Sequence, residues 1–318
     1  MRKALRLLTL SLAAYLVLCS AIAVFLAEST LRPYHRLLSE SAVSNLRRAA
    51  TALKSQLDDV EISTSDGVPL RGWYIRPLNG NNDAVILLHG LGDNRLGMEG
   101  YAELLLNRGY SVLMPDARGH GESGGPLMTY GLLERDDIRR WFEWLQAKNH
   151  PGCIFGFAES MGAAQLLQSL ESEPNFCAVG AESSFSDFRE IAYDRIGQQF
   201  RDGPWVGRTL LRAVVEIAFA YVRLKYHLDL SKASPEESVA RTQVPVLLIH
   251  GAVDSNIPVR HSRGIKAANA SVELWEVADA DHCGAISVAP AELERRLITW
   301  FQTHDHSSHV TRDAIAAR

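Results

Sequence analysis

Apolar segments recur along the chain from residue 60 onward. Six of them are continuous apolar runs, at 84–89, 110–115, 153–157, 177–181, 244–250 and 272–277. Continuous apolarity is typical of strands that are covered on both faces, as in a parallel sheet. Two earlier segments, "VEIST" and "VPLRGWYI", flank Asp66-Gly67, which is a hairpin turn signal.

Helical spacing of apolar residues fills the intervals between these runs. It is found near 95–108, 130–148, 160–171, 258–268 and 291–303. The repeated strand–helix order predicts a doubly wound α/β domain.

One interval is far longer than a single crossover helix needs. It covers about residues 185–241 and contains the apolar to amphipathic helix "TLLRAVVEIAFAYVRLKY". An insertion after a strand's carboxyl end stands over the position where open α/β sheets bind ligands. We interpret the interval as a helical cap; an extra structural helix pair is the alternative.

The N-terminal segment 1–30 has a different pattern. Arg2, Lys3 and Arg6 precede a nearly uncharged run, 7–27, which is long enough to cross a bilayer. The basic flank predicts a single-pass signal-anchor with the main domain on the non-cytoplasmic side, although Arg32, His35 and Arg36 on the far side weaken this orientation. A cleaved signal peptide, which would give a secreted form, and a buried core helix are the alternatives.

The segments at the two ends of the main domain are predicted from spacing. In 31–57, apolar residues recur every three or four positions from Leu38 to Leu57, which predicts an amphipathic helix that connects the anchor to the domain. The tail 304–318 lacks core spacing and is predicted to be disordered.

Composition narrows the possible functions. The 318 residues are 47% hydrophobic and 22% charged, with a net charge of −4, and the basic residues are scattered. These values are ordinary for a globular protein and argue against a nucleic-acid partner. Four cysteines make no disulfide framework in a chain of this length. We expect them to be small buried residues, with a Cys153–Cys177 bridge between neighbouring strands as the alternative.

The stretch "GFAESMGAA" joins an apolar run to a helical one at Ser160. A serine on a sharp strand-to-helix turn is the outline of a nucleophile elbow, usually G-x-S-x-G, which exposes the hydroxyl at a helix N-terminus. Here Ala158 replaces the first glycine and Gly162 keeps the second small position. An ordinary serine N-cap is the alternative for this stretch alone.

A serine hydroxyl needs a base and an acid that orients the base. Asp254 follows the apolar strand of "VPVLLIHGAVDSNIP", and His282 lies in the loop after the last predicted strand. The order Ser160, Asp254, His282 is the one expected of α/β-hydrolases. Asp279 and Asp281 are weaker candidates for the acid.

The reaction also needs donors to an oxyanion. The strand in "ILLHGLGDNR" ends in His89-Gly90, and the next amide, that of Leu91, could pair with the amide of Met161 around the developing charge. We expect His89 to brace this loop rather than to perform chemistry.

Five ordered motifs together resemble the α/β-hydrolase superfamily: "LLHGLGDNRLGM", "MPDARGHGESGG", "FGFAESMGAA", "IHGAVDSNIP" and "ADHCG". The chain is most similar to the membrane-anchored BEM46-like branch, close to the serine-aminopeptidase-like hydrolases, over about residues 58–303. The resemblance implies an eight-stranded sheet with an antiparallel second strand. It also implies a catalytic triad of Ser160, Asp254 and His282, an oxyanion hole at Leu91 and Met161, and supporting loops that contain His89, Gly90, Asp116, Arg118 and His120.

The expected activity is acyl transfer through a covalent serine ester, with an acyl or lipid-like ester as substrate. Such a mechanism needs no metal and no organic cofactor. Peptidase or amidase activity, acyl transfer to another acceptor, and a non-catalytic membrane-anchored binding module remain alternatives. The sequence leaves the oligomeric state open.

Overall fold

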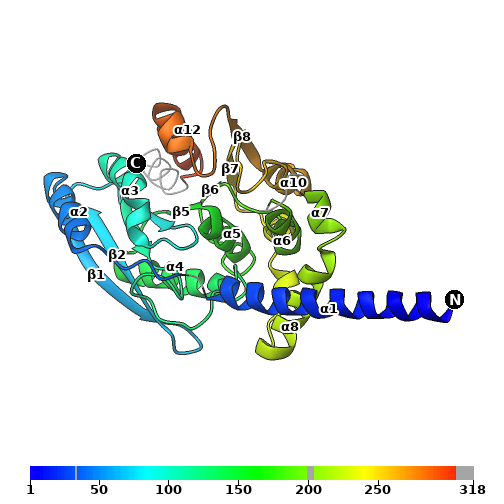
Figure 1. The fold of residues 1–318 in the computed structure, drawn as a ribbon. Coiled ribbons are helices and arrows are strands. Elements are labelled where there is room, and N and C mark those ends of the chain that lie inside the picture. Colours follow the sequence, from blue (N-terminus) through cyan, green and yellow to red (C-terminus); the bar gives the residue numbers. More distant parts are fainter. Residues whose placement is uncertain (33, 199–203, 306–318) are drawn as a thin grey trace.

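A single eight-stranded sheet forms the centre of the protein (Figure 1). The computed structural model describes residues 1–32, 34–198 and 204–305. The sheet order is β1-β2-β4-β3-β5-β6-β7-β8, and β2 is antiparallel to both of its neighbours. The other neighbours from β4 to β8 are parallel, as the resemblance implied. The strands are β1 Ser55–Ser63, β2 Pro69–Pro77, β3 Ala84–Leu88, β4 Ser111–Pro115, β5 Ile154–Glu159, β6 Val179–Glu182, β7 Val246–Gly251 and β8 Glu273–Val277.

Helices cover both faces of the sheet and extend beyond it. Their bounds are α1 Arg2–Leu31, α2 Glu40–Ala52, α3 Glu99–Asn107, α4 Glu134–Asn149, α5 Ser160–Ser169, α6 Phe188–Gly197, α7 Pro204–Arg208, α8 Arg212–Tyr226, α9 Pro235–Arg241, α10 Arg260–Ala268, α11 Ala285–Val288 and α12 Pro290–Thr303. Two 3₁₀ turns, η1 Arg95–Met98 and η2 Leu230–Lys232, complete the elements.

Two apolar cores lie on opposite faces of the sheet, as expected for strands without an exposed face. Helices α2, α3 and α12 pack on one face, where Phe155 and Phe157 of β5 are fully buried. Helices α4, α5, α9 and α10 pack on the other face against residues such as Ile86 and Leu248.

The interval between β6 and β7 is helical. It contains α6 to α9, and α6 and α8 share a third apolar cluster with residues that adjoin the end of β5, including Met161. The cluster also includes Ala27 and Leu31 of α1, so the N-terminal helix rests on the inserted helices. Figure 1 shows α1 running past α8, with its N-terminal end projecting away from the rest of the protein.

Helix α1 is one continuous helix of 30 residues. It is long enough and apolar enough to cross a bilayer by length and composition. The predicted connecting helix 31–57 is shorter than expected, because α2 spans only Glu40–Ala52. The chain turns at Lys54, whose φ is 51°, and residues 55–57 already pair with β2, so the last turn of the prediction is wrong.

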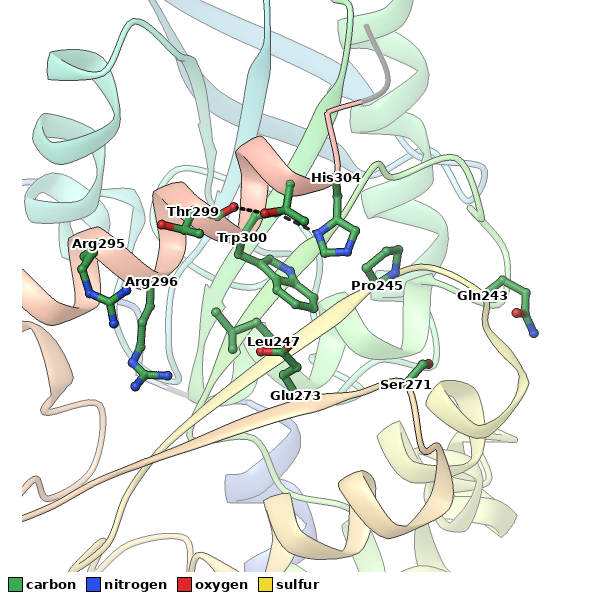
Figure 2. Close-up of a pocket in the computed structure, with 11 residues that line it drawn as sticks. Gln243, Pro245, Leu247, Ser271, Glu273, Arg295, Arg296, Thr299, Trp300 and His304 are labelled. Atoms are coloured by element: carbon green, nitrogen blue, oxygen red, sulfur yellow. Dashed lines mark hydrogen bonds between the residues drawn. The ribbon is translucent and has the colours of Figure 1, made fainter. Parts of the chain in front are cut away.

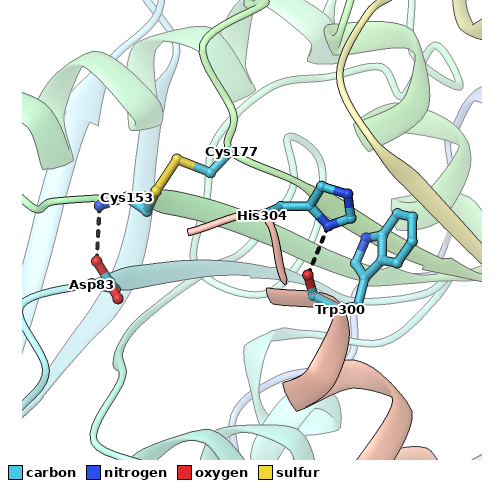
Figure 3. The surroundings of a disulfide bond; sticks show 5 residues. All are labelled: Asp83, Cys153, Cys177, Trp300 and His304. Atoms are coloured by element: carbon cyan, nitrogen blue, oxygen red, sulfur yellow. Dashed lines mark hydrogen bonds between the residues drawn. A yellow bond between two sulfur atoms is a disulfide. The ribbon is translucent and has the colours of Figure 1, made fainter. Parts of the chain in front are cut away.

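The expectation that Cys153 and Cys177 are unpaired is also wrong. Their sulfur atoms form a disulfide beside the starts of β5 and β6, as shown in Figure 3. Asp83 accepts a hydrogen bond from the Cys153 amide at 2.9 Å, which fixes the chain at this end of the sheet. The cysteines whose thiols are free among the described residues are Cys19 and Cys283. Of the predicted tail 304–318, residues 306–318 lie outside the described part of the chain.

Candidate functional site

Ser160 lies at the junction between β5 and α5. Its φ is 51°, in the left-handed region that a residue other than glycine seldom adopts, so the turn is strained in the manner of a nucleophile elbow. Gly162 allows this turn to lie against β3. A Cβ atom there would lie 2.6 Å from the carbonyl oxygen of His89 and 2.7 Å from that of Leu88, which is too close for any side chain.

The departure from the usual elbow pattern is accommodated in the core. Ala158 is fully buried in the apolar cluster on the α4–α5 face of the sheet. Its methyl group therefore packs against apolar neighbours, and the chain still reverses at Ser160.

The three side chains that the sequence singled out meet in one hydrogen-bonded chain. His282 Nε2 lies 2.8 Å from Ser160 Oγ, and His282 Nδ1 lies 2.9 Å from Asp254 Oδ2. The residues come from the loops after β5, β7 and β8, at the carboxyl end of the sheet. Gly251 lets the last two loops approach, because a Cβ there would lie 2.3 Å from the carbonyl oxygen of Ala280.

The Asp254 carboxylate is buried and fully used. Its Oδ1 accepts the amides of Asn256 at 2.9 Å and Ile257 at 2.8 Å, while Oδ2 faces His282 and lies 3.3 Å from His250 Nε2. Burial alone would raise the pKa of Asp254. The hydrogen bonds from the two imidazoles and from the Ile257 amide outweigh burial and hold this pKa well below its usual range, so the group is ionised at neutral pH.

The weaker acid candidates do not take this position. Asp281 Oδ1 accepts the main-chain amides of Ser255 at 2.7 Å and of His282 at 2.8 Å, so it shapes the loop that carries the histidine. Asp279 is a turn residue with φ 60°.

The predicted oxyanion donors flank the serine. Met161 follows Ser160 at the start of α5, where main-chain amides have no partner within the helix. Gly90, next to Leu91, is close on the other side, since a Cβ on it would lie 3.5 Å from Ser160 Cβ. The Leu91 side chain is half exposed, which leaves this side of the site open. The role of the two amides stays a prediction.

Two buried histidines tie the supporting loops together. His89 Nδ1 lies 2.8 Å from the Gly90 carbonyl oxygen, and its Nε2 accepts the Ala117 amide at 3.1 Å. His120 Nε2 accepts the Gly92 amide at 3.3 Å. Burial lowers the pKa of both, to about 4 for His120, so both are neutral braces rather than bases.

Asp116 and Arg118 hold the same loops from behind. Asp116 is completely buried, and its carboxylate accepts the amides of Arg95 at 2.7 Å and Glu122 at 2.8 Å. Arg118 binds Asp137 through two nitrogen atoms, at 2.6 and 2.7 Å. Neither residue is bonded to Ser160 or His282, so their contribution is to the shape of the site.

Sequence reasoning missed a largely buried acidic cluster that begins at Glu159, the residue before the serine. The Tyr101 hydroxyl lies 2.7 Å from Glu159 Oε1 and 2.9 Å from Glu182 Oε2, and Glu182 also accepts the Ala285 amide at 2.9 Å. Burial raises the pKa of Glu159 to about 8 and also raises that of Glu182. A phenol has one proton to donate, so the second contact is a hydrogen bond only if one carboxyl group is protonated.

The signal for this cluster was present but ambiguous. Glu159 and Glu182 each end an apolar strand, where a charged residue is unusual. Their common partner, Tyr101, lies on α3 and shows no pattern that links it to either of them.

A surface hollow of about 430 Å³ lies between the starts of β7 and β8 and α12, away from this site. It is lined by Pro245, Glu273 and Trp300 among others (Figure 2). It is at the amino end of the parallel strands, opposite the serine. Within the described ranges, no three His, Cys, Asp or Glu side chains are grouped so that they could hold a metal.

Comparison with known proteins settles the family. Residues 85–296 match the model of the Alpha/beta hydrolase family. This chain belongs to the alpha/beta hydrolase family. The predicted fold and the predicted superfamily are therefore confirmed.

Individual relatives agree with this assignment. The chain is 30% identical to YqkD of Bacillus subtilis over 62% of this chain and 63% of that protein. It is 26% identical to human ABHD12B over 60% of this chain and 51% of that protein, in line with the predicted BEM46-like branch. Among solved structures it resembles the Pyrococcus furiosus esterase Pf2001, with a TM-score of 0.67, 26% identity, and coverage of 86% of this chain and 99% of that one.

Proposed function

We propose that this protein is a serine hydrolase that cleaves a carboxylic ester through an acyl-enzyme intermediate. The observation that carries the proposal is the unbroken contact from Ser160 Oγ through the His282 ring to Asp254, at 2.8 and 2.9 Å. This is the arrangement by which an imidazole activates a serine hydroxyl.

The geometry supports the following sequence of steps. His282 Nε2 accepts the proton of Ser160 as Oγ attacks the ester carbonyl carbon, and Asp254 stabilises the imidazolium that forms. The resulting oxyanion accepts hydrogen bonds from the amides of Leu91 and Met161. His282 then gives its proton to the leaving alcohol, which departs as the C–O bond breaks. Water attacks the acyl-enzyme with His282 as base, and the acid is released with Ser160 restored.

An ester with an apolar acyl group is the favoured substrate class. Met161, next to the nucleophile, belongs to the apolar cluster formed with α6 and α8. The likeness to an esterase at 26% identity also favours ester cleavage over amide cleavage.

We further propose that α1 is an uncleaved single-pass anchor and that the hydrolase domain lies on the non-cytoplasmic side. The exposed apolar surface of α1 supports the anchor, because large side chains such as Leu8, Val17 and Phe25 are more than half exposed. The Cys153–Cys177 disulfide supports the orientation, because disulfides persist in oxidising compartments. Retention in the membrane pellet after alkaline carbonate extraction, together with digestion of the domain by protease added outside intact cells, is the expected result; release by carbonate would contradict the anchor.

The activity is tested on the full-length protein with matched p-nitrophenyl esters and p-nitroanilides of acetate, butyrate and decanoate. We expect ester cleavage to exceed anilide cleavage, and Ser160→Ala to abolish it. Ser172→Ala, which removes an exposed hydroxyl after α5, is the matched control and should be fully active. Faster anilide cleavage would indicate a peptidase or amidase, and preferential transfer to an added alcohol would indicate an acyltransferase. A folded protein that does neither would indicate a binding module.

A further inference from the structure

The C-terminal half of helix α1 is attached to the inserted helix α8. Its buried residues lie on one stripe, Cys19, Ala23, Ala27 and Leu31. Cys19 and Ala23 pack with Val214 of α8 in an apolar cluster of their own. The small side chains allow the two helices to approach closely.

Polar contacts close both ends of this seam. The Tyr15 hydroxyl donates to the Leu210 carbonyl oxygen at 2.6 Å, just before α8 begins. At the other end, Glu28 accepts hydrogen bonds from the hydroxyls of Tyr221 and Tyr226, both at 2.7 Å. From Tyr15 onward, α1 is therefore part of the folded body rather than a free stem.

The free part of α1 is too short to cross a bilayer. Arg2–Ala14 comprises 13 residues, which at about 1.5 Å per residue is about 20 Å. The hydrocarbon core is about 30 Å thick, so about 10 Å of the crossing remains even if the basic residues at the start of α1 lie inside it. If the crossing begins at Leu7, the remainder is about 18 Å. That remainder is the part of α1 that runs beside the cap.

The surface of the cap beside this part of α1 suits a lipid environment. Trp205 and Leu210 are both 61% exposed at the end of the cap that adjoins Tyr15. Arg212 is exposed at the start of α8, and its long side chain can extend from the apolar surface toward the polar side of the membrane. Exposed apolar side chains gathered at one end of a protein are typical of a surface that contacts lipid.

Several other charges of the cap are paired. Arg208 donates to Asp194 at 2.9 Å, and Glu216 accepts from Arg189 at 2.6 Å. They therefore need not be desolvated alone when the cap meets lipid.

We propose that the α7–α8 end of the cap lies in the outer leaflet of the bilayer, held there by α1, and that the site takes an amphiphilic ester from that leaflet. The location of the cap rests on the proposed anchor, and the choice of substrate rests on the proposed ester hydrolase activity. The apolar cluster that includes Ala27 and Leu31 also includes Met161, so continuous apolar packing joins the anchor to the residue beside the nucleophile.

The location is tested without any activity assay. Full-length Leu210→Cys protein is labelled with an NBD fluorophore and reconstituted into vesicles of phosphatidylcholine and phosphatidylglycerol that carry doxyl quenchers on their acyl chains. Leu10→Cys, on the free part of α1, marks the bilayer core. Leu78→Cys, an exposed leucine after β2 with 74% exposure, marks the aqueous side. The unsubstituted protein corrects for labelling of the native thiols.

We expect the doxyl lipids to quench the Leu210 and Leu10 probes by about half or more and the Leu78 probe little, because interfacial helices sink about 5–10 Å into the acyl boundary. Quenching at Leu10 without quenching at Leu210 would overturn the location of the cap and leave the anchor standing. Quenching at neither position would overturn both.

A matched pair of variants tests the role of α1. Ala23→Leu enlarges a fully buried residue of the α1–α8 seam, whereas Ile22→Leu alters the neighbouring partly exposed position. We expect only Ala23→Leu to reduce quenching at Leu210, with quenching at Leu10 and the circular dichroism spectrum unchanged. Unchanged quenching in Ala23→Leu would contradict the proposal that α1 holds the cap in the leaflet.

The substrate part is tested by comparing a long-chain ester embedded in the vesicles with p-nitrophenyl acetate in water. Trp205→Glu combined with Leu210→Glu should lower the rate on the embedded ester at least tenfold and leave the rate on the acetate unchanged. Equal rates of the double variant and the wild type on the embedded ester would overturn this part of the proposal. Loss of both activities in the wild type would instead refute the proposed function, independently of the quenching result.

Discussion

The substitution Asp254→Asn gives the sharpest prediction about the site. Asp254 Oδ1 accepts two main-chain amides, at 2.9 and 2.8 Å, and only an oxygen can occupy that position. The asparagine oxygen will therefore face these amides, and its NH₂ group will face His282 Nδ1 in place of Oδ2. A donor at this position forces the imidazole to carry its proton on Nε2.

An imidazole protonated on Nε2 cannot accept the proton of Ser160. The variant thus retains shape and packing but has the wrong histidine tautomer, and the imidazolium loses its counter-charge. The same exchange in the serine protease triad lowers kcat by about 10⁴, and we expect a loss of this order, or about 5.5 kcal/mol of transition-state stabilisation.

The assay is steady-state hydrolysis of p-nitrophenyl butyrate by the full-length protein. We expect kcat to fall while KM changes little, because ground-state binding does not involve the tautomer. Asp281→Asn is the control, since that carboxylate accepts main-chain amides and leaves Nδ1 alone. A kcat of Asp254→Asn within tenfold of the wild type would mean that Asp254 does not set the tautomer on which the reaction depends.

Three further predictions concern packing, pH and the disulfide. Gly162→Ala should lower activity and destabilise the fold by about 1–3 kcal/mol, because the new Cβ would lie less than 3 Å from two carbonyl oxygens. Ala158→Gly should remain active. Equal thermal stability of the wild type and Gly162→Ala would contradict the expected clash. Burial raises the pKa of Glu159 to about 8, so the stability that its neutral form contributes is complete below the pKa of the unfolded chain and is lost as pH rises toward 8. Glu159→Gln should therefore lose less thermal stability than the wild type between pH 5 and pH 8. Parallel curves of thermal stability against pH for the two proteins would argue against the raised pKa. Replacing Cys153 and Cys177 by serine, 24 residues apart, should cost about 3 kcal/mol by denaturant unfolding, and no change would mean that the bridge does not form.

The sheet could be predicted, and so could the three side chains that meet at its carboxyl end, because their signals are local. Each strand is a continuous apolar run, and Ser160, Asp254 and His282 each follow such a run in an order that one fold explains. The hydrogen-bonded contact of the three side chains is what the order led us to expect.

Other features depend on contacts that no local pattern encodes. The Cys153–Cys177 bridge requires two strand starts to be neighbours with the side chains on the same side, and apolar spacing does not report side-chain direction. The start of β1 at Ser55 was missed, because the apolar spacing of residues 55–57 continues the helical pattern before them. In the folded protein these residues pair with β2, and this pairing overrides the local preference for a helix. Ala23 packs against Val214, although the two residues are 191 positions apart in the sequence. The sequence pattern around each residue predicts an anchor and a cap helix separately and gives no sign that the two helices meet.

The proposed function requires Ser160 to be a nucleophile made reactive by His282. It is tested most directly by treating the folded full-length protein with a fluorophosphonate and locating the adduct by peptide mass spectrometry. We expect one phosphonylated residue, Ser160, with no adduct in Ser160→Ala and at most trace labelling in His282→Ala. An adduct on another residue, or undiminished labelling of His282→Ala, would contradict it.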